Sequence, residues 1–284
     1  MKPFCLNCSL GIHNMSTAVL IEPRCHPALG FVLRNLHENI PVHWKILVFH
    51  GMNNRERVHS LLNTLPTERW MPPIELEIDN LTREMYNGLL MSPDFYDAIP
   101  TEHHLIVQTD AILFAEHRHF LPLFLSYDYV GAPWKNGWVG NGGLSLRRTR
   151  QMKAICEQVT PADAVTDIFQ LVSEQHAPSP MLEGISWAEW VEQCKQNLSF
   201  ASEINEDLYF SYQQRIRLHK PPASLARYFA VESVFCDTTW GTHAPWKNLS
   251  PSELHALRTR YPELNEYMRQ FIDESTSERP ENTR

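Results

Sequence analysis

Short apolar runs alternate with helical patterns over the first half of the chain. Thr17–Ile21 is β-branched and apolar, and similar runs recur at Ile46–Phe49 and Leu105–Val107; each has the length and composition of a buried parallel strand. Between the first two runs, Pro27–Asn39 carries leucine and valine at helical spacing. This alternation predicts an α/β fold with a mainly parallel central sheet and helices on both faces.

The remaining elements are less regular, and no internal repeat is present. Thr82 is predicted to cap a helix that runs to Met91, because Thr is a preferred N-cap residue and Glu84 lies in the first turn. The other expected elements are a helix at Arg57–Leu65, strands at Ile74–Ile78 and Tyr228–Phe235, and helices at Thr149–Gln158 and Asn205–Arg215. We also expect mixed helical material at Pro161–Gln196, interrupted at residues 177–180, and an amphipathic helix after Ser250.

A chain of 284 residues suits one large domain. We expect residues 1–16 to be a loose leader, 17–249 to form the domain, and 250–284 to add a C-terminal helix and a polar tail. The tail from Glu274 onward is polar enough to be disordered.

The bulk composition excludes several classes of partner. A formal net charge of −8 argues against a nucleic-acid backbone as the main partner. The N-terminus lacks the pattern of a signal peptide and no run reaches the length of a membrane span, so we expect a cytoplasmic protein. Cys5 and Cys8 have zinc-knuckle spacing, but no second pair follows, so ordinary reduced thiols are expected.

Asp110 is the first candidate for chemistry. It follows the strand-like run Leu105–Val107 after Gln108 and Thr109, and ligands of open α/β sheets bind where buried strands end. A carboxylate there could hold a hard divalent cation against phosphate oxygens. The alternative is a turn or helix cap, since Asp is favoured in both.

Glu206 and Asp207 form the second candidate. A carboxylate is a usual base for removing a proton from an acceptor hydroxyl. The alternative is a normal helix start in which Asn205 is the cap and both acids face the positive end of the helix dipole.

Several other residues could belong to a site. His243 lies in a Gly-Thr-His-Ala-Pro-Trp turn and is a reasonable third ligand for Mn²⁺, although a lone histidine is more often structural. The glycines of Gly140–Gly143 allow close approach of a ligand or form only a tight turn, and they lack the Lys-Ser/Thr of a phosphate-binding P-loop. Trp134, Trp138 and Trp246 could stack on sugar or base rings or simply pack.

Taken together, these motifs resemble the domain-of-unknown-function family 5672 (DUF5672), which looks like glycosyltransferases of the A-type (GT-A) fold. The resemblance runs in order from about Thr17 to Trp246. It is carried by Thr17–Arg24, His26–Leu29, Phe49–Gly51, Tyr86–Leu90, Gln108–Asp110, Tyr127–Trp134, Val139–Arg147, Glu206–Ser211, Phe229–Ser233 and Gly241–His243.

The resemblance assigns roles to particular residues. A-type enzymes carry an Asp-X-Asp motif whose last acid binds Mn²⁺ or Mg²⁺ and the donor diphosphate; here the triplet is Gln108-Thr109-Asp110, so its first acid is missing. His243 falls where many such enzymes place a histidine ligand. Glu206-Asp207 resembles the Glu-Asp motif of β1,3-galactosyltransferase-like enzymes, in which a carboxylate is the general base. The resemblance also implies donor binding by Glu22, Arg24, His50, Gln108, Thr109, Gly142 and Gly143, and sugar or acceptor binding by Trp134, Trp138, Asn141 and Trp246.

The sequence thus leads to the hypothesis of a metal-assisted, inverting glycosyltransferase that moves a sugar from a UDP-sugar to a hydroxyl of a glycan, protein or small molecule. Inversion and the choice of UDP follow from analogy, and residues 160–200 are expected on the acceptor side. Two alternatives stay open: a catalytically silent carbohydrate- or nucleotide-binding domain, and a metal-dependent nucleotidyl or phosphoryl transferase.

Overall fold

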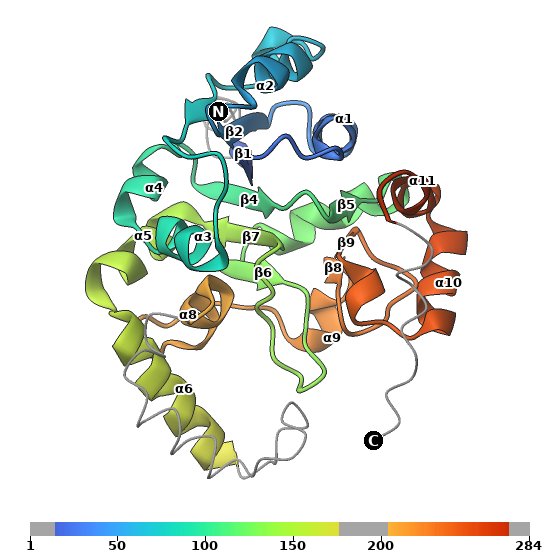
Figure 1. The fold of residues 1–284 in the computed structure, drawn as a ribbon. Helices are drawn as coiled ribbons and strands as arrows, with labels where there is room; N and C mark the ends of the chain where they lie inside the picture. Colours follow the sequence, from blue (N-terminus) through green and yellow to red (C-terminus); the bar gives the residue numbers. More distant parts are fainter. Residues whose placement is uncertain (1–14, 176–203, 273–284) are drawn as a thin grey trace, which may run out of the picture.

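The computed structural model describes residues 15–175 and 204–272, and a six-stranded sheet with helices on both faces dominates it (Figure 1). The strand order is β3-β2-β1-β4-β7-β6. Strands β1 to β4 are mutually parallel, whereas β7 runs antiparallel to both of its neighbours. The strands are β1 (Ser16–Glu22), β2 (Lys45–His50), β3 (Ile74–Glu75), β4 (His103–Val107), β6 (Tyr129–Gly131) and β7 (Leu144–Arg148). The predicted α/β class with a mainly parallel sheet is confirmed.

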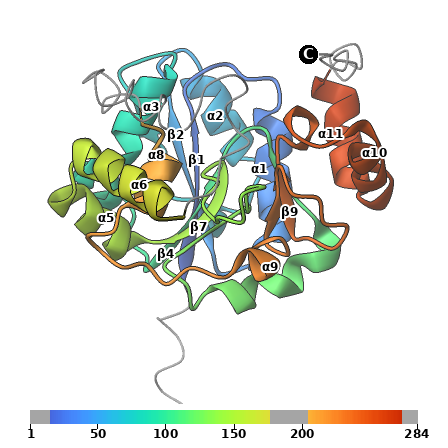
Figure 2. The same cartoon turned by 90° about the horizontal axis from the view of Figure 1, so that it is seen from below.

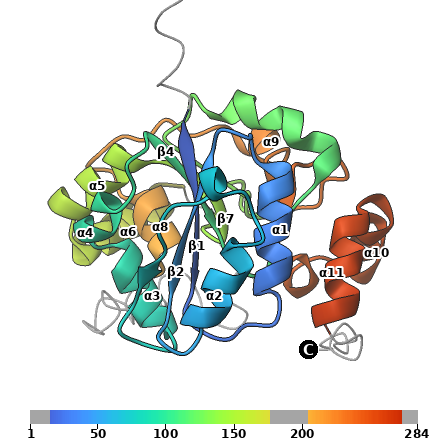
Figure 3. The same ribbon diagram turned by 90° about the horizontal axis from the view of Figure 1, so that it is seen from above.

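Alternate residues of the central strands point to opposite faces of the sheet, as the strand period requires. Ala18 and Leu20 of β1 enter one apolar cluster, and Val19 and Ile21 enter the other. The first face is covered by α1 (Leu29–Asn39) and α2 (Arg55–Leu62), and the second by α3 (Arg83–Leu90), α4 (Pro93–Asp97), α5 (Thr149–Gln158), α6 (Pro161–Gln175) and α8 (Glu206–Tyr212). Figures 2 and 3 show these two helical layers on either side of the strands.

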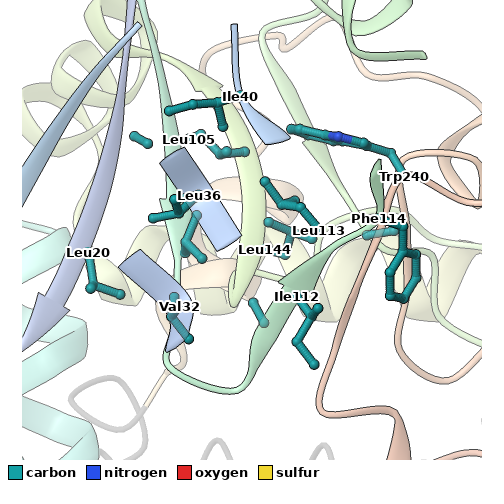
Figure 4. Packing of buried hydrophobic residues seen from close by; sticks show 14 of the residues in the cluster. Leu20, Val32, Leu36, Ile40, Leu105, Ile112, Leu113, Phe114, Leu144 and Trp240 are labelled. Carbon is teal, nitrogen blue, oxygen red and sulfur yellow. The ribbon is translucent and has the colours of Figure 1, made fainter. Parts of the chain in front are cut away.

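A second, three-stranded sheet extends from the end of β4. Its order is β5 (Ala111–Leu113), β9 (Gly241–His243), β8 (Ala230–Val231). Ile112 and Leu113 of β5 pack with Leu36 of α1 and Leu144 of β7 (Figure 4). Because β9 pairs with β5, the small sheet places residues from the C-terminal third of the chain next to the end of β4.

The segment after Ser250 forms two helices, α10 (Pro251–Arg260) and α11 (Pro262–Phe271), where one was predicted. Ser250 and Glu253 form a reciprocal capping box at the start of α10. The break falls at Tyr261 because the residue before a proline is disfavoured in the helical region. Tyr261 stacks on Phe114 with ring centroids 3.8 Å apart, so both helices belong to the main apolar cluster.

Several predicted boundaries were wrong in their extent. The predicted strands at Ile74–Ile78 and Tyr228–Phe235 are only two residues long, at Ile74–Glu75 and Ala230–Val231, and the helix begun at Asn205 ends at Tyr212 rather than Arg215. Strands β5, β6, β7 and β9 were not predicted. The helix at Thr149–Gln158 has the predicted ends. The remaining described elements are the 3-10 helices η1 (Thr67–Arg69), η2 (Ala115–Phe124) and η4 (Pro245–Lys247) and the short helix α9 (Ala223–Ala226).

Some expectations lie outside the described residues: most of the leader, the Cys5–Cys8 pair, the interruption at residues 177–180 and the polar tail. Within residues 15–175 and 204–272, no helix is both long and apolar enough to span a bilayer.

Candidate functional site

A cleft of about 430 Å³ opens at the carboxyl ends of β1 and β4. These strands are parallel neighbours, so the residues that follow them emerge at the same edge of the sheet, where open α/β sheets bind ligands. The lining residues are Ile21, Glu22, Pro23, Arg24, His26, Leu81, Thr82, Arg83, Tyr86, Gln108, Thr109, Asp110 and Lys247. The structure thus brings together Glu22, Arg24 and the triplet Gln108–Asp110.

Asp110 is held between two basic groups. Its Oδ1 lies 3.2 Å from His243 Nε2, and its Oδ2 accepts a hydrogen bond of 2.9 Å from Lys247 Nζ. Burial disfavours the charged form, but His243 and Lys247 together hold the pKa of Asp110 well below its ordinary value. The carboxylate is therefore ionised throughout the physiological range.

The pairing of β5 with β9 places His243 beside Asp110. Ala111 pairs with His243 across the ladder, and the Ala244 amide donates to the Asp110 carbonyl over 2.9 Å. Ala244 has a φ of +42°, the left-handed region that a residue with a Cβ rarely adopts. Strained backbone of this kind persists where the surrounding structure fixes it, often at functional sites.

His243 makes contacts through both ring nitrogens. Nε2 lies 3.1 Å from Gln108 Oε1 as well as near Asp110, while Nδ1 faces Glu232 Oε1 at 3.8 Å and has no hydrogen-bond partner. Burial lowers the pKa of His243, but the carboxylates of Asp110 and Glu232 outweigh burial and raise it to about 9. The ring is therefore cationic at neutral pH in this arrangement.

A divalent cation fits these residues only as an ion shared with a ligand. The described residues contain no group of three or more His, Cys, Asp or Glu side chains suited to a metal. Asp110 and His243 Nε2 nevertheless face each other, and Glu232 stands on the far nitrogen, as a carboxylate does behind a metal-bound histidine. Mg²⁺ is commonly held by one or two carboxylates with substrate phosphates completing its shell. Asp110 and the neutral form of His243 fit that pattern, so a bound cation would displace the proton from the ring, and Lys247 is a competing cation on the same carboxylate.

Gly142 and Gly143 lie against the two sides of the site. A Cβ on Gly143 would come within 2.2 Å of His243 Nε2, and one on Gly142 would come within 2.1 Å of Glu206 Oε1 and 3.1 Å of Asp207 Cβ. The Gly143 carbonyl also accepts a hydrogen bond from the Gln108 amide. Glycine is required here because any side chain would displace these neighbours, so this pair of residues joins the Asp110 side to the Asp207 side.

Glu206 is fully engaged in a buried ion pair. Arg147 NH1 donates to Glu206 Oε2 over 2.7 Å, and NH2 donates to Oε1 over 3.0 Å. Arg147 is 0% exposed and lies over the Tyr129 and Phe210 rings. The alternative of a side-chain cap by Asn205 is wrong: Asn205 makes no such bond, and Asn87 of α3 accepts from the Glu206 amide instead. Both carboxylate oxygens of Glu206 therefore serve the fold.

Asp207 has a different environment one residue later. Its Oδ1 accepts from the Leu208 amide over 2.8 Å, and its Oδ2 makes a long contact of 3.4 Å with the Gly142 amide. The side chain is half-buried. Burial, followed by the nearby charge of Glu206, raises the pKa of Asp207 to about 7. This is the protonation behaviour expected of a general base that works near neutral pH.

The end of the cleft next to β1 contains a second acid–base pair. Arg24 Nε and NH2 donate to Glu22 Oε1 and Oε2, each over 2.8 Å, and Thr109 Oγ1 donates to Glu22 over 3.1 Å. Asn54 Nδ2 donates to the carbonyls of Glu22 and Arg24 and fixes the turn after β1. Arg24 remains half exposed, so its guanidinium can still meet a ligand.

Other predicted residues lie elsewhere. His50 is 2% exposed and outside the cleft lining, and its Nδ1 bonds to the Gly51 carbonyl. Trp246 stacks on Tyr267 with centroids 5.6 Å apart. Asn141, in contrast, lies beside the site, because its side chain bridges Glu232 and the Gly143 amide. Trp134 and Trp138 both contact Tyr212 at the end of α8, away from Asp110.

Sequence reasoning missed Arg147, Glu232 and Lys247 as functional neighbours. Arg147 and Glu232 lie inside motifs that carried the family resemblance, and that position is the one signal that could have identified them. Lys247 directly follows the turn Gly241–Trp246 and has no sequence signal of its own, because its contact with Asp110 spans 137 positions.

Comparison with solved structures gave matches that include glycosyltransferases. The apo form of the glycosyltransferase GlyE of Streptococcus pneumoniae TIGR4 aligns with 91% of this chain and 64% of its own at 11% identity, with a TM-score of 0.48. The mannosyltransferase PcManGT of Pyrobaculum calidifontis, solved with GDP-Man and Mn²⁺, aligns over 54% of this chain at 13% identity and a TM-score of 0.41. S. aureus TarS 1–349 with UDP-GlcNAc aligns over 49% of this chain and 47% of its own, at 13% identity and a TM-score of 0.36.

This chain spans about half the length, 50%, of the mannosyltransferase. At these scores the similarities carry no conclusion about activity, ligand or cofactor. Comparison with curated protein sequences gave no match.

A family model gives the clearest assignment. The model described as "Protein of unknown function (DUF5672)" matches residues 74–245, which is more than half of the chain. The matched range contains Asp110, Asp207 and His243, and it leaves β1 with Glu22 outside. The chain belongs to the DUF5672 family of proteins of unknown function, as its motifs predicted.

Proposed function

We propose that this protein is a nucleotide-sugar-dependent glycosyltransferase that moves a sugar from a UDP-sugar to an acceptor hydroxyl with inversion. One observation carries the proposal: two carboxylates in opposite electrostatic states are joined through the Gly142–Gly143 pair. Asp110 is kept ionised among cations, while the pKa of Asp207 is raised to about 7. Groups whose pKa values are driven apart in this way commonly have separate roles in one reaction.

The Asp110 side suits a diphosphate. Arg24, Arg83 and Lys247 line the cleft and supply positive charge for phosphate oxygens. Asp110 and His243 would hold a Mn²⁺ or Mg²⁺ ion together with the donor, and the chemistry that such an ion supplies is neutralisation of charge on the departing diphosphate. Lys247 provides part of the same neutralisation from the chain itself.

The Asp207 side suits the acceptor. Asp207 accepts the proton of the acceptor hydroxyl as that oxygen attacks the anomeric carbon and the bond to the diphosphate oxygen breaks. Attack from the face opposite the leaving group inverts the anomeric centre. Glu206 is unsuited to this role because Arg147 binds both of its oxygens.

The test is a panel of UDP- and GDP-sugars incubated with the full chain and Mn²⁺ or Mg²⁺. Slow release of the nucleoside diphosphate, with the released sugar inverted at its anomeric carbon by NMR, is the expected result. Asp207→Asn should lose this release. Consumption of added pyrophosphate together with the nucleotide sugar, to give a nucleoside triphosphate and a sugar 1-phosphate, would instead assign the chain to nucleotidyl transfer. Retention of configuration would contradict the role of Asp207.

A catalytically silent nucleotide-sugar-binding domain is the second candidate. Its support is that Gln108 replaces an acid of the Asp-X-Asp triplet and that both oxygens of Asp110 are occupied by cationic side chains. Binding of UDP by calorimetry without any release of diphosphate from the panel would favour it over the enzyme.

A further inference from the structure

A second cleft of about 510 Å³ lies at the other end of α8 from Glu206. We name it the Trp138 cleft; its lining residues are Gly137, Trp138, Val139, Leu171, Ser211, Tyr212, Gln214, Leu218, Lys220, Pro221, Pro222 and Ala223. It shares no lining residue with the Asp110 cleft. The function proposed above uses none of these residues as a binding surface.

Helix α8 connects this cleft to Asp207. Ser211 lies four residues after Asp207, so the two side chains are on the same face of the helix one turn apart. Tyr212 is close enough for the Asp207 charge to contribute to its raised pKa, after the larger effect of burial. Ser211, which lines the Trp138 cleft, is therefore about one helical turn from the proposed base, roughly 6 Å along the axis.

One wall of the cleft is aromatic. The Trp138 and Tyr212 rings have centroids 4.0 Å apart, and Trp134 stacks behind Tyr212 at 5.8 Å with an interplanar angle of 20°. Trp138 remains partly exposed. A partly exposed aromatic face of this kind, with polar groups beside it, suits the apolar face of a sugar ring.

The Trp138 cleft also contains the ammonium group of Lys220. Lys220 Nζ donates to the Ser211 carbonyl and lies 5.4 Å from the centroid of the Tyr212 ring. Within residues 15–175 and 204–272, no acidic side chain forms an ion pair with it. Burial lowers the pKa of Lys220 to about 8. A partly desolvated cation with one neutral acceptor gains most from an anionic ligand.

We propose that the Trp138 cleft binds the acceptor of the transfer reaction, and that this acceptor is a saccharide carrying an acidic group, either carboxylate or phosphate. The sugar ring lies on Trp138 and the acidic group meets Lys220, which leaves a hydroxyl directed along α8 toward Asp207. The term acceptor rests on the proposed function; binding of an acidic saccharide does not.

Saturation-transfer NMR titrations of the full chain without nucleotide test this directly. The probes are methyl β-glucuronide, glucose 6-phosphate and the neutral methyl β-glucoside. We expect at least one acidic probe to bind about tenfold more tightly than the glucoside, as a charge-assisted hydrogen bond would provide. The better of the two acidic probes identifies the group.

Two variants separate the contribution of the Lys220 charge from that of the Trp138 ring. Lys220→Met should lower the affinity for the acidic probes to that for the glucoside. The affinity for the glucoside should stay unchanged, which also shows that the variant is folded. Trp138→Ala should weaken all three probes by a similar factor. Lys153→Met is the matched control. It removes a partly exposed lysine of α5 that pairs with Asp97 of α4, and it should leave the affinity for all three probes unchanged.

The proposal is overturned if none of the probes binds, if charged and neutral probes bind equally, or if the preference survives Lys220→Met. These results are independent of the nucleotide-sugar panel, because no donor is present. A chain that binds acidic saccharides but releases no diphosphate would contradict the proposed function alone.

Discussion

The carboxylates at the two ends of the site, Asp110 after β4 and Asp207 in the first turn of α8, have opposite environments. Asp110 lies between His243 and Lys247, and its pKa is held down. Asp207 has only amide donors, and its pKa is raised to about 7 by burial and by Glu206. The difference shows that burial alone does not set a carboxylate's state; the charge of its nearest partner does.

Removing the Asp207 carboxylate should have the largest effect. Asp207→Asn keeps the size of the side chain but cannot accept a proton, so kcat for sugar transfer should fall by about 10² to 10⁴-fold. Donor affinity should stay within a few-fold of the wild-type value, since Asp207 is not part of the Asp110 cleft. Steady-state kinetics with separate calorimetric donor titrations check both. Full activity in the variant would remove Asp207 from the chemistry.

Breaking the neighbouring ion pair should mainly affect folding. Glu206→Gln leaves the buried Arg147 guanidinium without its counter-charge, which should lower the free energy of unfolding by about 3 to 5 kcal/mol. Urea denaturation of this variant measures the loss. The double variant Arg147→Met/Glu206→Gln should recover part of it, because no unpaired charge remains buried. A stable Glu206→Gln variant would contradict the structural role.

Asp207→Asn should instead stabilise the protein. Folding raises the pKa of Asp207 from 3.8 to about 7, so the unfolded chain releases this proton first and stability falls as pH rises between these values. At pH 8 the variant should gain about 1 to 3 kcal/mol, allowing for solvent screening of a half-buried group. Near pH 4 the gain should vanish. Chemical denaturation at both pH values checks the sign.

The pH dependence of turnover should follow the same group. Asp207 is faced by Glu206, Arg147 and Glu232, and its carboxylate form dominates above about pH 7. The value of kcat/KM should therefore rise with pH up to about 7 and then level off. The profile of residual activity in Asp207→Asn should lack this rise. An unchanged profile in the variant would assign the titration to another group.

The sequence was sufficient for the three central parallel strands and for the positions of the two acids. Thr17–Ile21, Ile46–Phe49 and Leu105–Val107 are apolar because both faces of their strands are buried, and that constraint is local. Asp110 and Asp207 could be located because each directly follows or begins a predictable element.

The electrostatic partners could not be predicted in the same way. Arg147 is a fully buried cation inside β7, so it interrupts the apolar pattern by which strands are recognised, and its partner Glu206 is 59 positions away. Asn205 has the local signature of a helix cap, but Asn87 from another helix takes that role. In both cases a tertiary contact decides the outcome, and single-sequence patterns do not record tertiary contacts.

The most direct test of the central claim is calorimetric binding of UDP with Mn²⁺ to the wild type, Asp110→Asn and Asp207→Asn. If the cleft at the end of β4 holds the donor diphosphate and Asp207 serves only the chemical step, Asp110→Asn should lose metal-dependent binding and Asp207→Asn should keep it. Equal binding by all three proteins, or loss of binding in Asp207→Asn alone, would contradict the division of roles between the two carboxylates.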